Sequence, residues 1–134
     1  MRLEVEKRPA IENATAFDVR AAVADLRSYG PSSYASLTDA QGSYLQMAGG
    51  GVTCMLEWRD AVNRRHFRAH LDAPSKVFPD GTILTFGGGE VKLKNDEWLT
   101  ASMVEAAFLA FLEGKPLPAA IGWRDISAMF ENLA

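Results

Sequence analysis

Two glycine triplets, each set between short apolar runs, constrain the fold of this chain more than any other feature of its sequence. The first lies in YLQMAGGGVTCML (residues 44–56) and the second in TILTFGGGEVKL (residues 82–93). A glycine loop that binds phosphate leads into a helix, whose N-terminal N–H groups meet the anion. Here both triplets lead into strand-like runs, VTCMLEW and EVKLK. Because glycine readily adopts the positive φ of tight turns, the sequence predicts two β-hairpins and no phosphate loop.

The chain around these triplets also has a strand-like pattern. Residues 33–94 contain short runs rich in β-branched and aromatic residues, separated by turn-forming segments such as TDAQG, RDAVN and APSKVFPDG. This pattern is typical of a meander of antiparallel strands, and RLEVEKR near the N-terminus predicts a further strand. Along VTCMLEW, alternation places four residues on one face, which we expect in the core: Val52, Cys54, Leu56 and Trp58. As the only cysteine, Cys54 fits there as a small buried residue, with a reactive thiol as the alternative.

Helical signals lie on both sides of the strand-rich region. The segment TAFDVRAAVADLRSYGP predicts a helix over about residues 16–28, with Thr15 as N-cap. The segment LTASMVEAAFLAFLEGKPLP predicts a second helix over residues 101–113, with Thr100 as N-cap. The tail AIGWRDISAMFENLA is apolar enough to pack back on the body as a strand or short helix. Three aromatic residues from these segments are expected in the core: Phe108, Phe111 and Trp123.

Together these patterns predict one α+β domain over residues 1–134. Its single antiparallel sheet, a meander of about five or six strands, should carry the two main helices on one face. A chain of 134 residues with 48% hydrophobic residues can fill one core without a metal or a disulfide. The start, MRLEVEKRPA, lacks the apolar run of a signal peptide, and no membrane-spanning apolar stretch follows. We therefore expect a cytoplasmic protein that does not associate with membranes.

The balance of charge bears on the partner. A net charge of −3 and a pI near 5.4 disfavour direct nucleic-acid binding, which depends on many Lys and Arg residues. A partner selected by charge would be basic. Several acidic residues gather in predicted turns and strand ends, namely Asp80, Glu90, Asp96 and Glu97, with Asp39 on another turn. They form either an ordinary solvated surface or a docking patch that steers a basic partner.

The two histidines, His66 and His70 in RRHFRAH, raise the question of a metal or catalytic site. On a strand, residues four apart lie about 13 Å from each other and cannot share an ion, so no metal or cofactor is expected. An acid–base site is possible if the strands pair across RDAVN, which would bring Glu57 near His66, Arg68 and His70. The alternative is a cross-strand charge ladder on a solvated face, in which arginines balance Glu57 and Asp60. No nucleophile elbow or Ser-His-Asp order accompanies these residues, so the sequence favours the ladder.

Four segments, in their order along the chain, resemble a group of small bacterial α+β proteins. They are YLQMAGGGVTCMLEWRD, RRHFRAH, EWLTASMVEAAFLAFLEG and IGWRDIS, and the resemblance extends over roughly residues 33–127. Its motifs are Tyr-x-Gln before a glycine turn, Glu-Trp-Arg, a helix that ends in glycine and a late tryptophan. Several members of this group are encoded beside polymorphic or contact-dependent growth inhibition toxins as immunity proteins.

The resemblance implies a protein that is not an enzyme and that neutralises a cytoplasm-acting toxin domain by stoichiometric binding. Its partner would be the C-terminal domain of a cognate toxin with a basic surface, as a nuclease would have. Because turn and strand-end carboxylates are free to reach a partner, we expect these to bind it: Asp80, Glu90, Asp96 and Glu97, followed by Glu57 and Asp60. Two alternatives stay open at this point. One is a small hydrolase or nuclease that uses His66 or His70 with Glu57, and the other is a non-enzymatic adaptor or homo-oligomeric protein.

Overall fold

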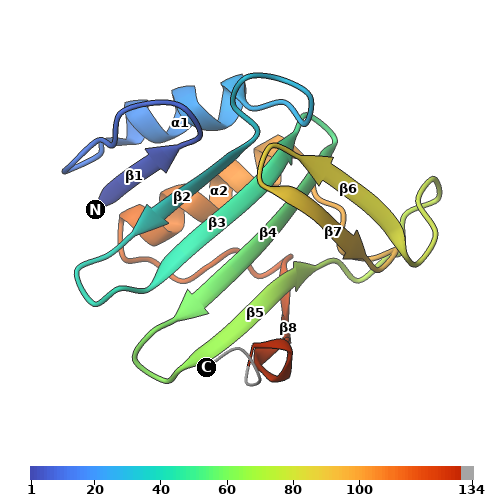
Figure 1. Ribbon diagram of the computed structural model, residues 1–134. Coiled ribbons are helices and arrows are strands. Elements are labelled where there is room, and N and C mark those ends of the chain that lie inside the picture. Colours follow the sequence, from blue (N-terminus) through green and yellow to red (C-terminus); the bar gives the residue numbers. More distant parts are fainter. Residues whose placement is uncertain (131–134) are drawn as a thin grey trace.

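A six-stranded antiparallel sheet forms the centre of the computed structural model, which describes residues 1–130 (Figure 1). Its strand order is β1 (Arg2–Val5), β2 (Tyr34–Thr38), β3 (Tyr44–Gly50), β4 (Thr53–Asp60), β5 (Arg65–His70) and β8 (Gly122–Asp125). A separate hairpin consists of β6 (Thr82–Phe86) and β7 (Gly89–Leu93). The helical elements are α1 (Ala16–Asp25), α2 (Ala101–Leu112) and the 3₁₀-helix η1 (Ser127–Met129). The predicted α+β fold is therefore confirmed.

Both helices begin where their caps predict. The Thr15 hydroxyl accepts a hydrogen bond from the Asp18 N–H, and the Asp18 carboxylate accepts one from the Thr15 N–H, so a complete capping box starts α1. The helix ends at Asp25, three residues earlier than predicted, because the buried Leu26 takes an extended conformation. At the start of α2 the Thr100 hydroxyl accepts a hydrogen bond from the Met103 N–H at 3.4 Å. Both helices lie on one face of the sheet, as predicted (Figure 1).

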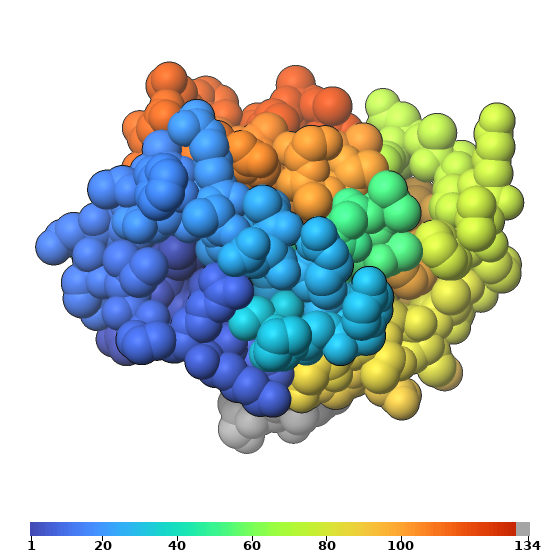
Figure 2. All heavy atoms as spheres, turned by 90° about the horizontal axis from the view of Figure 1, so that it is seen from above, coloured from blue at the N-terminus to red at the C-terminus, as the bar shows by residue number. Residues whose placement is uncertain are grey.

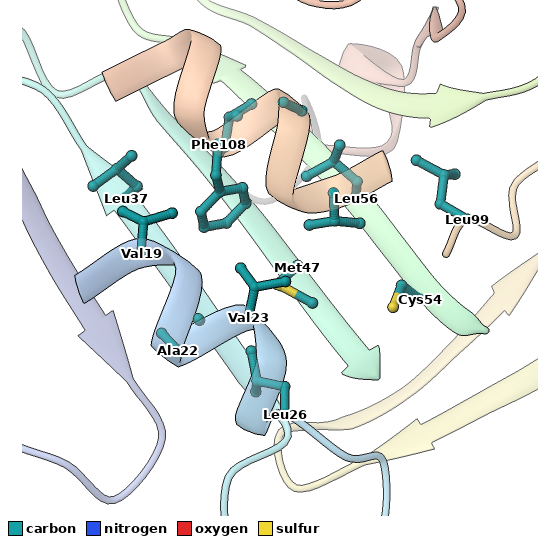
Figure 3. Packing of buried hydrophobic residues seen from close by; sticks show 14 of the residues in the cluster. Val19, Ala22, Val23, Leu26, Leu37, Met47, Cys54, Leu56, Leu99 and Phe108 are labelled. Carbon is teal, nitrogen blue, oxygen red and sulfur yellow. The ribbon is translucent and has the colours of Figure 1, made fainter. Parts of the chain in front are cut away.

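The main core lies between these helices and the sheet. Phe108 of α2 is fully buried and points into the space between α1 and the central strands (Figure 3). Val19 and Val23 of α1 and Met47 of β3 belong to the same cluster. Of the residues predicted to be core, three are buried, namely Cys54, Leu56 and Phe108, while Trp58, Phe111 and Trp123 are partly buried and pack against the cluster.

The first glycine triplet forms a hairpin, but the turn lies further along the chain than the triplet suggests. Strand β3 continues through Gly49 and Gly50, and the two-residue turn consists of Gly51 and Val52. Val52 is therefore exposed, and its predicted place in the core is wrong. Gly50 is needed for close packing, because a Cβ there would collide with the carbonyl group of Leu26 at the end of α1. The second triplet likewise turns the β6–β7 hairpin.

The β6–β7 hairpin departs from the predicted continuous meander. Among residues 1–130 it pairs with no other strand; it crosses the face of the sheet opposite the helices, and β8 takes the place beside β5 (Figure 1). A second apolar cluster beneath it consists of Ala48, Met55, Leu84, Leu93 and Trp98. The hairpin lies outside the sheet because there it can bury this apolar part of the second face, which a simple meander would leave exposed to water. No helix among residues 1–130 is long and apolar enough to cross a membrane.

Candidate functional site

Buried ionisable side chains form a network on the sheet face that the hairpin covers. The β4–β5 register places Glu57 opposite Arg68, and the β5–β8 register places Arg68 opposite Arg124. Arg68 donates to Glu57 Oε2 through Nε at 2.9 Å, and its Nη2 lies 2.8 Å from the same oxygen. His66 Nε2 lies 3.2 Å from Glu57 Oε1. Since an ionised carboxylate can only accept, this contact requires the proton on His66 Nε2.

The loop that follows β7 supplies two further carboxylates to the network. Arg124 donates to Glu97 Oε2 at 2.7 Å and to Asp96 Oδ2 at 2.8 Å. Glu97 Oε1 accepts the Lys94 N–H at 2.7 Å and lies 3.6 Å from Arg68 Nη1. Glu97 thus bridges the two guanidinium groups, and its exposed fraction is only 1%. The network joins β4, β5 and β8 to the loop that follows the hairpin.

The expected charge ladder is present in one pair, Glu57 with Arg68, whereas Arg65 pairs with Asp125 and Asp60 bonds to Asn63. The expectation that the Glu57–Arg68 pair lies on a solvated face is wrong. Glu57, His66 and Arg68 are all buried. Phe130 stacks on the His66 ring at a centroid distance of 4.2 Å, and the Ser127 hydroxyl accepts the His66 backbone N–H at 2.9 Å. The hairpin and the C-terminal segment therefore cover charges that strand alternation alone would leave in water. Such burial is tolerated because each charged group has hydrogen-bonding partners.

The surroundings of Glu57 shift its pKa, so the ionisation of this side chain contributes to the stability of the fold. Burial raises the pKa of Glu57, but hydrogen bonds from His66 and Arg68 and the charge of Arg68 outweigh it, so the pKa is lowered from its ordinary value of 4.5. The unfolded chain therefore binds this proton more readily than the folded one. The resulting stabilisation is complete above the unfolded-state pKa and is lost as the pH falls through the folded-state pKa.

We predict that this effect is visible in urea unfolding. The wild type should be more stable than the Glu57→Gln variant at pH 7, because in the variant Arg68 loses the nearer of its two carboxylate partners. The difference in free energy of unfolding should shrink as the pH falls below about 4.5, where the Glu57 carboxylate of the unfolded chain binds a proton first, and it should vanish once the pH is below the lower folded-state pKa as well. A difference between the two proteins that stays constant from pH 7 to pH 3 would contradict this account of Glu57.

A cavity of about 510 Å³ lies beside the network, between the hairpin and the β8–η1 segment. Arg68, Glu97 and Arg124 line it together with apolar Leu93, Ile126 and Met129. Glu57 and His66 do not line it, so the pair that could exchange a proton does not open into this space. His70 is not part of the pair, because its Nδ1 lies 3.3 Å from the Leu71 carbonyl oxygen. Within residues 1–130, no three His, Cys, Asp or Glu side chains converge as a metal site requires.

The six carboxylates expected to bind a partner do not share one surface. Asp80 and Glu90 are exposed, whereas Asp60 is half-buried and Asp96 is half-buried against Arg124. Glu57 and Glu97 are buried in internal ion pairs, so the expectation that these two are free to reach a partner is wrong. The turn-like sequence around Glu97 predicts a position at the surface, but the side chain points inward to two arginines. The exposed Lys92 and Lys94 further divide the remaining acids.

Arg124 is the member of the network that sequence reasoning missed. The signal lies in GWRD: alternation along β8 sets Arg124 on the face opposite Trp123, which packs with the helices. Cys54 agrees with its predicted structural role, since burial raises the pKa of its thiol to about 12. Comparison of the chain with known protein families, with curated proteins and with solved structures gives no match.

Proposed function

We propose that this protein is an immunity protein, which binds and neutralises a cognate toxin domain in the cytoplasm of the producing cell. One observation carries the proposal: Glu57, His66 and Arg68, the residues best suited to acid–base chemistry, are buried and bonded to one another. Glu57 and His66 do not line the cavity beside the network, so the pair that could exchange a proton stabilises the scaffold and is not presented to a substrate there. The acidic balance of the chain and its resemblance to immunity proteins also support a binding role.

The proposed inhibitor acts by binding to the toxin domain, so inhibition depends on its surface residues more than on its interior. A toxin domain that cleaves nucleic acid needs a positive substrate groove, and accessible carboxylates favour approach to such a groove. Asp80 and Glu90 are the most accessible of the expected contact residues, followed by the half-buried Asp60. Charges at the rim of an interface mainly set the rate of association, whereas its buried centre sets the rate of dissociation.

The test begins with the reading frame beside this gene. If it encodes a large toxin, its C-terminal domain should arrest growth when expressed alone, and co-expression of this protein should restore growth. The purified pair should form a 1:1 complex in titration calorimetry. Charge can be tested with the Asp80→Asn/Glu90→Gln double variant, which should associate more slowly. The Glu4→Gln/Glu12→Gln variant, also at exposed positions, is the matched control. Failure to rescue growth, with no complex at micromolar concentrations, would reject the proposal.

A hydrolase or nuclease is the second candidate, and the 3.2 Å contact between His66 and Glu57 is the observation that favours it. Under the immunity proposal, a His66→Gln/His70→Gln variant that folds should protect cells as well as the wild type does. Loss of protection by a folded variant that still binds the toxin domain with unchanged affinity would instead support catalysis. An adaptor or homo-oligomer would be indicated by partners other than one specific toxin fragment.

A further inference from the structure

Residues 72–95 form a segment that leaves the body of the fold and returns to it at one point. The Leu71 N–H donates to the Asp96 carbonyl oxygen at 2.8 Å, which holds the two ends of the segment together. Within the segment β6 pairs with β7, and the Ser75 N–H donates to the Asn95 carbonyl oxygen. Figure 2 shows its yellow-green to gold atoms gathered along one side of the molecule. We call residues 72–95 the lid segment.

Few backbone hydrogen bonds join the lid segment to the rest of the fold. Its two strands pair only with each other in the part of the chain that the structure describes. Among residues 1–130, the one backbone–backbone bond across its boundary is the turn bond from the Glu97 N–H to the Lys94 carbonyl oxygen. The Arg68 guanidinium adds a long bond of 3.3 Å to the Lys92 carbonyl oxygen. Within the described residues, no ladder of backbone bonds therefore fixes the lid segment to the sheet.

Little of the lid segment is buried. Leu84 and Leu93 are its only buried side chains, and they lie over the second apolar cluster. Phe78 stacks on Trp98 at a centroid distance of 4.3 Å but is itself only half-buried. Hydrophobic stabilisation is roughly proportional to the apolar area removed from water. The lid segment is therefore held by much less of it than the two helices on the other face.

The surface beneath the lid segment contains polar groups that lose water when it is covered. Trp98 is 8% exposed, and its Nε1–H is buried without a hydrogen-bond partner among residues 1–130. Buried polar groups almost always have a partner, and one without a partner destabilises the state that buries it. Glu57 and Arg68 also lie on this face, and burial of an ion pair costs hydration. Lifting the lid segment returns water to these groups, which offsets part of the apolar contact that is lost.

A buried serine ties the tip of the hairpin to the sheet. The Gly87 N–H donates to the Ser33 hydroxyl oxygen at 2.7 Å, and this hydroxyl donates to Glu6 Oε1 at 2.6 Å. The bond to a carboxylate is charge-assisted, so it orients the hydroxyl and leaves a lone pair for Gly87. The tip is thus held by one hydrogen bond to one side chain, which a single substitution can remove.

We propose that the lid segment opens as one unit while the six-stranded sheet and both helices stay folded. Opening breaks the bonds from Arg68 and to Ser33 and the apolar contacts of Leu84 and Leu93, whereas the main core on the other face keeps its contacts. It uncovers Trp98 and the face of the sheet on which the buried network lies. Because an isolated two-stranded hairpin is marginal in water, the amide protons of the lifted hairpin exchange with solvent. This inference does not depend on the proposed function.

The test is native-state amide hydrogen exchange of the full chain, followed by NMR at urea concentrations below the unfolding transition. Exchange of the β6 and β7 amides should depend weakly on urea, because opening of the lid segment exposes little surface. Exchange of the β3 and β4 amides should show the steep dependence of global unfolding. Equal urea dependence for the two groups of amides would overturn the proposal.

A substitution in the main core separates opening of the lid segment from global unfolding. Val23 is fully buried on the helix face, and its contacts persist when the lid segment opens. Val23→Ala should therefore speed exchange of the β3 and β4 amides about tenfold or more. The β6 and β7 amides should stay within about threefold of their wild-type rates, as for a substitution remote from the opening. Acceleration of all four strands by one common factor would show that the hairpin exchanges only when the whole fold unfolds.

Two serine variants test the tie at the hairpin tip. Ser33→Ala removes the acceptor of the Gly87 N–H and should speed exchange of the β6 and β7 amides about tenfold. Ser32→Ala is the matched control, because Ser32 is also buried but its hydroxyl donates to the Glu6 carbonyl oxygen at 3.0 Å. The control should leave the hairpin rates within about threefold of the wild type. Hairpin rates that respond equally to both variants would contradict the proposed opening.

Discussion

Replacing Arg68 with methionine is expected to lower the free energy of unfolding by about 3–5 kcal/mol, the cost of breaking a buried ion pair from one side. The guanidinium group contacts Glu57 and Glu97 and also donates to the Lys92 carbonyl of β7 at 3.3 Å. Its removal leaves two buried carboxylates short of a cation and loosens the hairpin from the sheet. Urea unfolding at pH 7, followed by circular dichroism, measures the loss.

A matched substitution separates burial from charge. Arg65 lies on the same strand and pairs with Asp125 at 3.5 Å, but both side chains are exposed. Arg65→Met should therefore change the free energy of unfolding by no more than about 1 kcal/mol. Equal losses for the Arg65 and Arg68 variants would contradict the view that the buried network holds the hairpin. If Glu57→Leu is added to Arg68→Met, stability should partly recover, because one of the unpaired charges is then removed.

Truncating Phe108 to alanine is expected to cost about 3–5 kcal/mol, the range for a fully buried aromatic residue. The ring lies at the junction of α1, α2 and the central strands, so its loss opens a cavity that both helices border (Figure 3). Differential scanning calorimetry and urea unfolding measure the effect. Phe17→Ala is the control: Phe17 lies on α1 but is exposed, so its loss should stay within about 0.5 kcal/mol. A Phe108→Ala variant as stable as the control would show that the core is placed wrongly.

The elements with local physical signals could be predicted from the sequence. The capping box at Thr15 and the N-cap at Thr100 fix where both helices begin. Glycine-rich turns between apolar runs predict the hairpins, and the strand pattern of RRHFRAH excludes a helical histidine pair. These signals depend on neighbours along the chain, so tertiary packing does not override them.

The errors arise where distant segments decide the outcome. Alternation assigns Glu57 to a face of the sheet but does not reveal that the β6–β7 hairpin and Phe130 cover that face. Glu97 follows a turn-like KND sequence, yet two arginines from other strands draw it inside. Val52 continues a strand pattern, but the turn consists of Gly51 and Val52, while Gly50 stays in β3 and packs against Leu26. The candidate site was therefore predicted by residue type and pairing, while its burial was not.

The position of β8 in the sheet has a consequence for the synthesis of the chain. Strands β1 to β5 are neighbours in both sequence and space, so they can pair as they leave the ribosome. The edge of β5 then stays unpaired until β8 is present, and β8 is translated only after the hairpin and α2. An unpaired strand edge readily pairs with other chains, so a stalled product ending before Gly122 should aggregate. Completion of this sheet thus depends on a strand that is translated after the hairpin and α2, and that strand protects the edge of the strands made before it.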